Sequence, residues 1–170
     1  MTFRTPSMML AAAALATLTA CGGKLITEQP FAISGDTVTV AWETTVPEGE
    51  ASLWLDYSLE TGSEHDITQG TTDAVYHMKG LLKVTSSDNP AYDGPLYLRS
   101  DGPPTTQLTS TVTIGSRQSC STKGCSISGR VRALNLDTLA AGSPIVISAA
   151  LPVQGEQIRI ESLGMQLRAK

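Results

Sequence analysis

The sequence lacks an apolar run long enough to span a bilayer as a helix, which takes about 20 residues. Its most apolar run, Met8–Leu18, has only 11 residues. An excess of basic residues is also absent, because 12 Lys and Arg stand against 16 Asp and Glu, for a formal net charge of −4. A nucleic-acid-binding domain is usually strongly basic. We therefore expect no nucleic-acid partner.

Signature motifs of catalysis are missing too. No Gly-x-Ser-x-Gly or Ser-x-x-Lys marks a nucleophile, and neither His-Glu-x-x-His nor a glycine-rich phosphate loop occurs. His65 lies between two carboxylates and is a candidate base or metal ligand, with a solvated loop histidine as the alternative. The 86–95 segment carries oxygen donors of the kind that calcium prefers, but the same residue types also form turns. We expect no enzyme, no cofactor and no bound metal, and a hydrolase with a site near His65 is the less favoured alternative.

The N-terminal segment has the pattern of a secretory signal. Arg4 precedes the apolar run, and small residues follow it at Thr19 and Ala20. The cysteine directly after them makes Leu18-Thr19-Ala20-Cys21 resemble the lipobox of bacterial lipoproteins. The resemblance implies a signal peptide over residues 1–20, cleavage before Cys21 and acylation of its thiol. An ordinary signal peptide with an incidental cysteine is the alternative.

The same resemblance implies an address. Gly22, rather than Asp, follows the cysteine, which resembles the outer-membrane lipoproteins of diderm bacteria. We expect a lipid-anchored protein of the envelope, in the outer membrane and facing the periplasm or the cell surface. More than one acyl chain is needed for stable anchoring. The membrane is thus one expected partner.

The remaining 150 residues have the length of one typical domain. Hydrophobic and polar residues alternate through most of it, which is typical of strands with one face in a core. Turn residues separate eight such segments: 37–43, 52–59, 75–84, 96–98, 108–114, 127–133, 145–151 and 158–167. The pattern predicts an antiparallel β-sandwich of about eight strands, immunoglobulin-like or jelly-roll-like, over residues 37–170. Residues 21–36 are interpreted as its lipid-anchored tether.

Two cysteines remain in this domain. Cys120 and Cys125 flank four residues that include a glycine, which is typical of a hairpin. Facing positions on paired strands are close enough for a disulfide. Outside the cytoplasm such a pair predicts a structural disulfide, whereas a redox or metal pair would need another spacing or more ligands.

Charge is uneven along the chain. Ten acidic residues and no Lys or Arg lie between Leu25 and Met78, whereas the interval 102–136 contains four basic residues and no acid. Opposite charges could pair across the sheets, or the molecule could have one basic end. The candidate binding residues are those four cations and an aromatic on a polar strand face: Arg117, Lys123, Arg130, Arg132 and Trp54.

These residues lead to two hypotheses. The first is a non-catalytic envelope lipoprotein whose sandwich binds an envelope protein or polymer near the membrane, with the cations contacting an anionic partner. The second is a carbohydrate-binding sandwich that uses Trp54, because an exposed indole stacks on sugars or anchors a protein. Trp54 covered by a loop or by residues 22–36 is the alternative reading.

Overall fold

The computed structural model describes residues 23–61, 77–86, 90–99, 110–113, 118–121, 124–155 and 158–170. The predicted signal peptide (1–20) and Cys21 lie outside these ranges. Within them the chain forms eleven strands: β1 (Lys24–Pro30), β2 (Ala32–Ser34), β3 (Thr37–Thr45), β4 (Ala51–Thr61), β5 (His77–Ser86), β6 (Pro90–Arg99), β7 (Ser110–Thr113), β8 (Gln118–Ser121), β9 (Gly124–Asn135), β10 (Pro144–Pro152) and β11 (Ile158–Ala169). A search of the described residues finds no helix suited to crossing a membrane.

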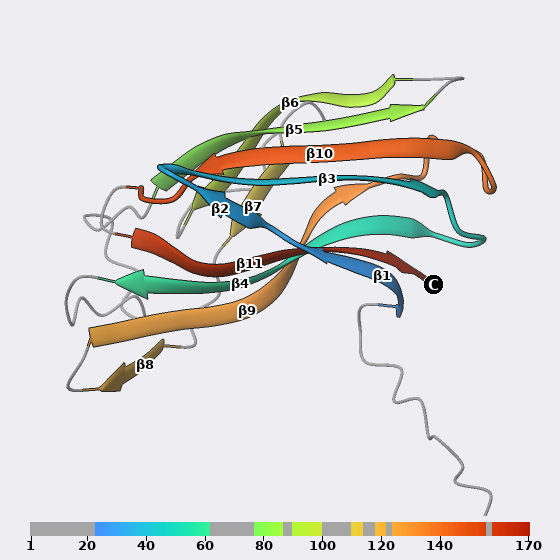
Figure 1. The fold of residues 1–170 in the computed structure, drawn as a ribbon. Coiled ribbons are helices and arrows are strands. Elements are labelled where there is room, and N and C mark those ends of the chain that lie inside the picture. Colours follow the sequence, from blue (N-terminus) through green and yellow to red (C-terminus); the bar gives the residue numbers. More distant parts are fainter. Residues whose placement is uncertain are drawn as a thin grey trace, which may run out of the picture.

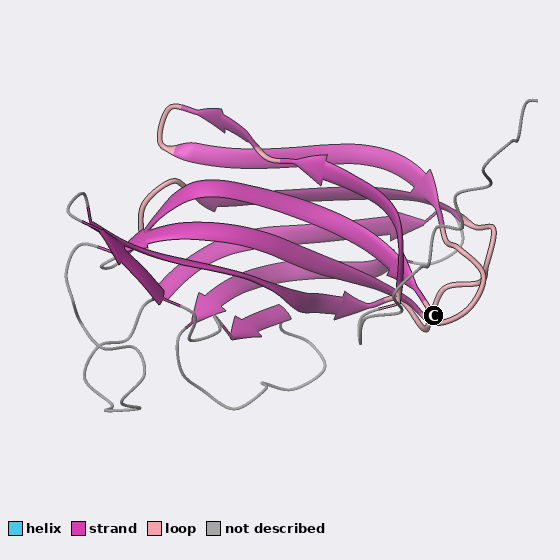
Figure 2. Cartoon of the chain, turned by 90° about the horizontal axis from the view of Figure 1, so that it is seen from below, coloured by secondary structure: helices cyan, strands magenta, loops and turns pink. Residues whose placement is uncertain are grey.

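The strands form two sheets that pack face to face (Figures 1 and 2). One sheet has five strands in the order β1-β11-β4-β9-β8, and the other has six in the order β2-β3-β10-β5-β6-β7. Every pair is antiparallel except β6 and β7, which run parallel. The predicted all-β sandwich is confirmed. Each of the eight alternating segments corresponds to a strand, and β1, β2 and β8 complete the sheets.

Residues 21–36 are not a tether through their whole length, and this prediction is wrong from Lys24 onward. β1 pairs along β11 from Lys24 opposite Ala169 to Pro30 opposite Gly164, and β2 pairs with β3. The segment was missed because β1 lies at a sheet edge, where most of its side chains are exposed and no alternation of apolar residues is needed. Its backbone hydrogen bonds to β11, rather than buried side chains, hold it in place. The domain therefore begins at Lys24.

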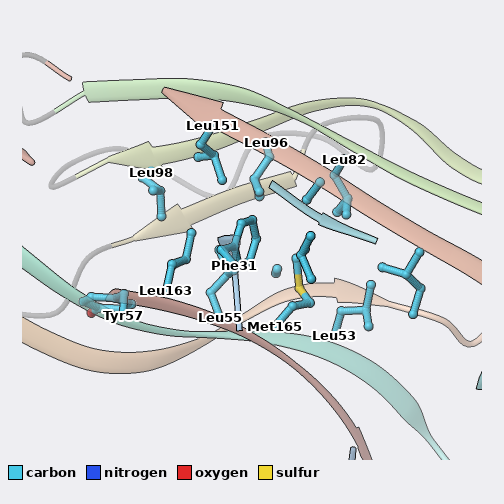
Figure 3. Close-up of a cluster of buried hydrophobic side chains, with 14 of the residues drawn as sticks. Phe31, Leu53, Leu55, Tyr57, Leu82, Leu96, Leu98, Leu151, Leu163 and Met165 are labelled. Atoms are coloured by element: carbon cyan, nitrogen blue, oxygen red, sulfur yellow. The ribbon is translucent and has the colours of Figure 1, made fainter. Parts of the chain in front are cut away.

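β1 and β2 are two parts of one extended segment that passes from the first sheet to the second (Figure 1). Phe31 stands at the crossing, where its amide donates to the carbonyl of Leu163 at 2.8 Å. Its ring is only 9% exposed. Figure 3 shows this ring between the sheets, among Leu55, Leu96 and Leu163. The N-terminal segment thus contributes an aromatic side chain to the core.

The core fills the space between the two sheets. Alternation places one face of each strand there: β4, for example, buries Leu53, Leu55 and Leu59 completely. The largest fully buried side chains come from both sheets: Leu53, Leu55, Leu59, Met78, Leu82, Leu96, Leu98, Ile127, Leu136, Ile145, Ile147 and Leu151. Each aliphatic side chain of this size contributes about 1.5–3 kcal/mol when it leaves water. This packing holds the outward-facing residues of the sheets in a fixed register.

The alternation of buried residues changes phase along the last strand. Ile158 and Ile160 face the core at its start, whereas Met165 and Leu167 do so at its end. The register with β4 shifts between Ile160 and Ser162, which marks a bulge. The bulge keeps both halves of β11 packed on the core and places Gln166 and Arg168 on the outer face of the sheet.

Candidate binding groove

The outer face of the five-stranded sheet brings together three of the residues that the sequence singled out. Arg132 on β9 pairs directly with Trp54 on β4, and Arg130 pairs with Asp56 two residues along. Directly opposite residues on paired strands project to the same face. Trp54, Arg130 and Arg132 therefore share one surface.

A register shift between Leu53 and Trp54 places Arg132 opposite Trp54. β9 carries one extra residue there, Ala133, so that Leu53 pairs with Leu134 and Trp54 with Arg132. Leu53 can then stay fully buried while Trp54 faces outward. Because of the bulge in β9, β4 keeps its core contacts through Leu53 and Leu55 on both sides of the register shift.

Trp54 is held in place but not covered completely. Its indole Nε1 donates to the hydroxyl of Ser52 at 2.9 Å, and its side chain is half-buried. On the other side of β4, Trp54 pairs with Gln166 of β11, which is only 3% exposed. The indole thus has a satisfied N–H and leaves part of its ring at the surface. The structure matches neither interpretation fully, because Trp54 is half-buried and its neighbours across the sheet are Gln166 and Arg132.

Trp54 lines an open groove of about 460 Å³. The other lining residues come from the ends of β4 and β9, the turn after β9 and the C-terminus: Glu50, Ala51, Ser52, Arg130, Val131, Arg132, Asn135, Asp137 and Lys170. Three of these are basic and two are acidic. Arg130 and Arg132 are exposed, and within the described residues neither forms an ion pair with a carboxylate. Both guanidinium groups are thus available to a ligand.

A series of hydrogen-bonded polar groups lies beside the groove, on the same face of the sheet. The Nε2 of Gln166 donates to Asp56 at 3.2 Å, and Nη1 of Arg168 donates to Oε1 of Gln166 at 2.9 Å. The Nη2 of Arg168 donates to the carbonyl of Gly23 at 2.7 Å. Burial lowers the pKa of Arg168 from its ordinary value, and the charge of Arg130 adds to this, whereas Glu28 and Asp56 oppose it. These hydrogen bonds connect Gly23, just before β1, to Asp56 on β4, the central strand of the sheet.

Sequence reasoning missed Arg168 and Gln166. Both occupy positions on the polar face of β11, where alternation predicts exposure, yet they are 7% and 3% exposed. β11 lies between β1 and β4 in the sheet, so side chains from both neighbours flank it. Only the strand order, which alternation does not give, reveals this burial.

Other predicted residues are not brought into the groove. Arg117, Lys123 and His65 lie outside the described residues. The oxygen donors of the 86–95 segment are Asp88, Asn89 and Asp93. Asp93 is in β6 and forms an ion pair with Lys83 at 3.1 Å, while Asp88 and Asn89 lie outside the described residues. Among the residues that the structure does describe, no group of three or more His, Cys, Asp or Glu could hold a metal ion.

The predicted hairpin of the cysteine pair is present. β8 and β9 pair in register with Cys120 opposite Cys125, and the strands extend to Ser121 and Gly124. Cys125 is buried and disulfide-bonded. The side chain of Cys120 lies outside the described residues, so the Cys120–Cys125 pairing stays a prediction, one that the backbone register favours.

Neither family models, nor curated proteins, nor solved structures give a match to this chain. The groove and the N-terminal motif are therefore the features that point to a function.

Proposed function

We propose that this protein is a non-catalytic lipoprotein of the bacterial envelope that binds an acidic envelope polysaccharide in the groove beside Trp54. The lipobox-like motif ending at Cys21 supports the anchor, and its Gly22 supports an outer-membrane address. The observation that carries the binding function is a half-buried indole next to two exposed guanidinium groups that form no ion pair with a carboxylate of the described residues. A hydrolase site near His65 remains the less favoured prediction.

The groove offers two kinds of contact that such a polymer needs. The indole of Trp54 presents an apolar face on which a sugar ring can stack. The guanidinium groups of Arg130 and Arg132 each offer several N–H donors in a planar fork, which matches a carboxylate or a phosphate. The groove is open rather than enclosed, so a chain can pass along it instead of ending in it. These features favour a polymer over a small metabolite.

Titration with polysaccharides tests the proposal. The purified protein is mixed with carboxylate-bearing or phosphate-bearing envelope polysaccharides and with their neutral counterparts, and tryptophan emission is followed. We expect the acidic polymers alone to change the emission, with an apparent affinity that falls as salt is added. Trp54→Ala should abolish the signal, because Trp42 packs against the core of the domain.

Charge reversal provides the matched control. Arg132→Glu should weaken binding by more than tenfold, whereas Arg159→Glu makes the same charge change at an exposed position of β11 outside the groove and should leave affinity unchanged. Equal affinity of both variants for every polymer would contradict the proposal.

An acidic envelope protein is the second candidate partner. Its capture from membranes by the wild type but not by Arg132→Glu, with no polymer bound, would replace the polysaccharide.

A further inference from the structure

The fold leaves little chain between the predicted lipid anchor and the domain. β1 begins at Lys24, three residues after Cys21. Consecutive Cα atoms are about 3.8 Å apart, so Gly23 lies within about 8 Å of the Cα of Cys21. The 16-residue tether expected from sequence would instead have reached about 50 Å when extended. An acyl group on Cys21 thus holds the start of β1 at the membrane surface.

Gly23 is not free to move away from the sheet. Its carbonyl accepts a hydrogen bond from the buried Arg168, and Lys24 pairs with Ala169. Gly23 has a φ of +71°, and a Cβ on it would meet the carbonyl oxygen of Ala169 at 2.5 Å, so no larger residue fits this conformation. β1 starts beside the C-terminus of the chain (Figure 1). The predicted lipid anchor at Cys21 is therefore followed almost directly by this end of the folded sandwich and not by a long flexible linker.

Two apolar side chains are exposed at this same end. Leu25 is 42% exposed and Ile26 is 44% exposed. The register with β11 places Leu25 opposite Arg168 and Thr27 opposite Leu167, so Ile26 is the extra residue of a bulge. The bulge explains why two consecutive apolar residues reach solvent on an edge strand, where strict alternation would turn one of them inward.

We infer that Leu25 and Ile26 are a second membrane contact, seated in the boundary between headgroups and acyl chains next to the anchor. This inference rests on the proposed lipidation of Cys21. Exposed apolar side chains beside an anchor gain by leaving water, and the short connection holds them where lipid is the nearest partner. Lys24, which is exposed and adjacent, can reach the phosphates of the headgroups.

This seating determines where the binding groove opens. Leu25 pairs with Arg168 and so lies on the outer face of the five-stranded sheet, as Trp54 does. Lys170 lines the groove, and its Cγ would be 3.2 Å from a Cβ at Gly23. The groove therefore opens close to the membrane plane, toward polymer that lies at the bilayer surface.

Depth-dependent quenching tests the inference. The full lipidated protein is reconstituted in vesicles of phosphatidylethanolamine and phosphatidylglycerol, with and without dibrominated phosphatidylcholine. Ile26→Trp is compared with Ile33→Trp, an exposed edge-strand isoleucine about 23 Å further along the chain. After subtraction of wild-type emission, we expect bromolipid to quench the tryptophan at position 26 at least threefold more strongly than the one at position 33.

The outcomes separate the seating from the anchor. Vesicle flotation and the mass of the N-terminal peptide report lipidation independently. If the protein floats but both tryptophans are quenched equally, the seating is wrong and the lipoprotein proposal stands. If the protein neither carries lipid nor floats, the lipoprotein proposal fails and the seating fails with it. A third outcome is that the emission of the tryptophan at position 26 shifts with protein concentration but is not quenched by bromolipid. This would indicate that the edge contacts a second copy of the chain, and it would overturn the inference.

Discussion

Replacement of Arg168 by methionine tests whether the buried hydrogen-bond chain stabilises the domain. Arg168 donates to Gln166 at 2.9 Å and to the carbonyl of Gly23 at 2.7 Å, and it is 7% exposed. Hydrogen bonds from a charged donor contribute about 1.5–3 kcal/mol each. The cost of burying the guanidinium, which also lowers the pKa of Arg168, offsets part of their sum. We expect Arg168→Met to reduce the free energy of unfolding by about 2–3 kcal/mol.

Denaturant unfolding measures this loss. In a domain of this size it corresponds to a decrease in Tm of about 5–10 °C. Arg168→Lys keeps the charge but offers one compact donor group, so it should lose about half as much stability. Arg132→Met removes an exposed arginine from the same sheet and should change stability by less than about 0.5 kcal/mol.

Hydrogen exchange locates the effect. Since Arg168 holds the carbonyl of Gly23, its loss should speed amide exchange in β1 more than in β4 or β9. Unfolding of Arg168→Met within about 0.5 kcal/mol of the wild type would refute the reasoning, because the two bonds would then give no net stabilisation. Slower exchange in β1 would refute it as well.

Three further changes give expected outcomes. Leu55→Ala, at a fully buried position, should destabilise the fold by about 3 kcal/mol in a denaturant titration, and Leu81→Ala, 63% exposed, by less than about 0.5 kcal/mol; equal losses would contradict the assigned core. Cys125→Ser should cost about 2 kcal/mol under oxidising conditions and nothing relative to wild type under reducing ones, if the predicted short loop is closed by a disulfide. Gly80→Ala should lower the Tm or the folded yield, because its Cβ would overlap a backbone oxygen of β10; an unchanged Tm would show that the strands can separate locally.

The sequence predicted much of the fold because one physical rule governs it. Residues such as Leu53 and Leu55 must face the core, so their spacing of two reveals the strand and its buried side. The same rule placed Trp54 on the polar face of β4 and Arg130 with Arg132 on one face of β9, as the structure confirms. The alternation of apolar and polar residues shows to which face of the sheet each side chain points. Within a single strand, this was enough to place Trp54, Arg130 and Arg132 on the outer face.

What the sequence left open depends on which strands are neighbours. The groove forms because β4 lies beside β9, and Arg168 is buried because β11 lies between β1 and β4. Alternation is the same whatever the strand order, so neither fact could be obtained from it. β1 was missed for another reason: it lies at a sheet edge with most of its side chains exposed, and its bulge at Ile26 exposes two apolar residues in succession, so the alternation is absent.

The pairing of β1 with β11 sets the order in which the domain can be completed. These are the first and last strands that the structure describes, and Lys24 pairs with Ala169 across almost the whole domain sequence. Closing so long a loop is slow and has a high entropic cost. In a chain that emerges from a narrow pore with its N-terminus first, β1 has no partner until β11 has appeared. This edge of the sheet therefore closes only after every other described strand has emerged.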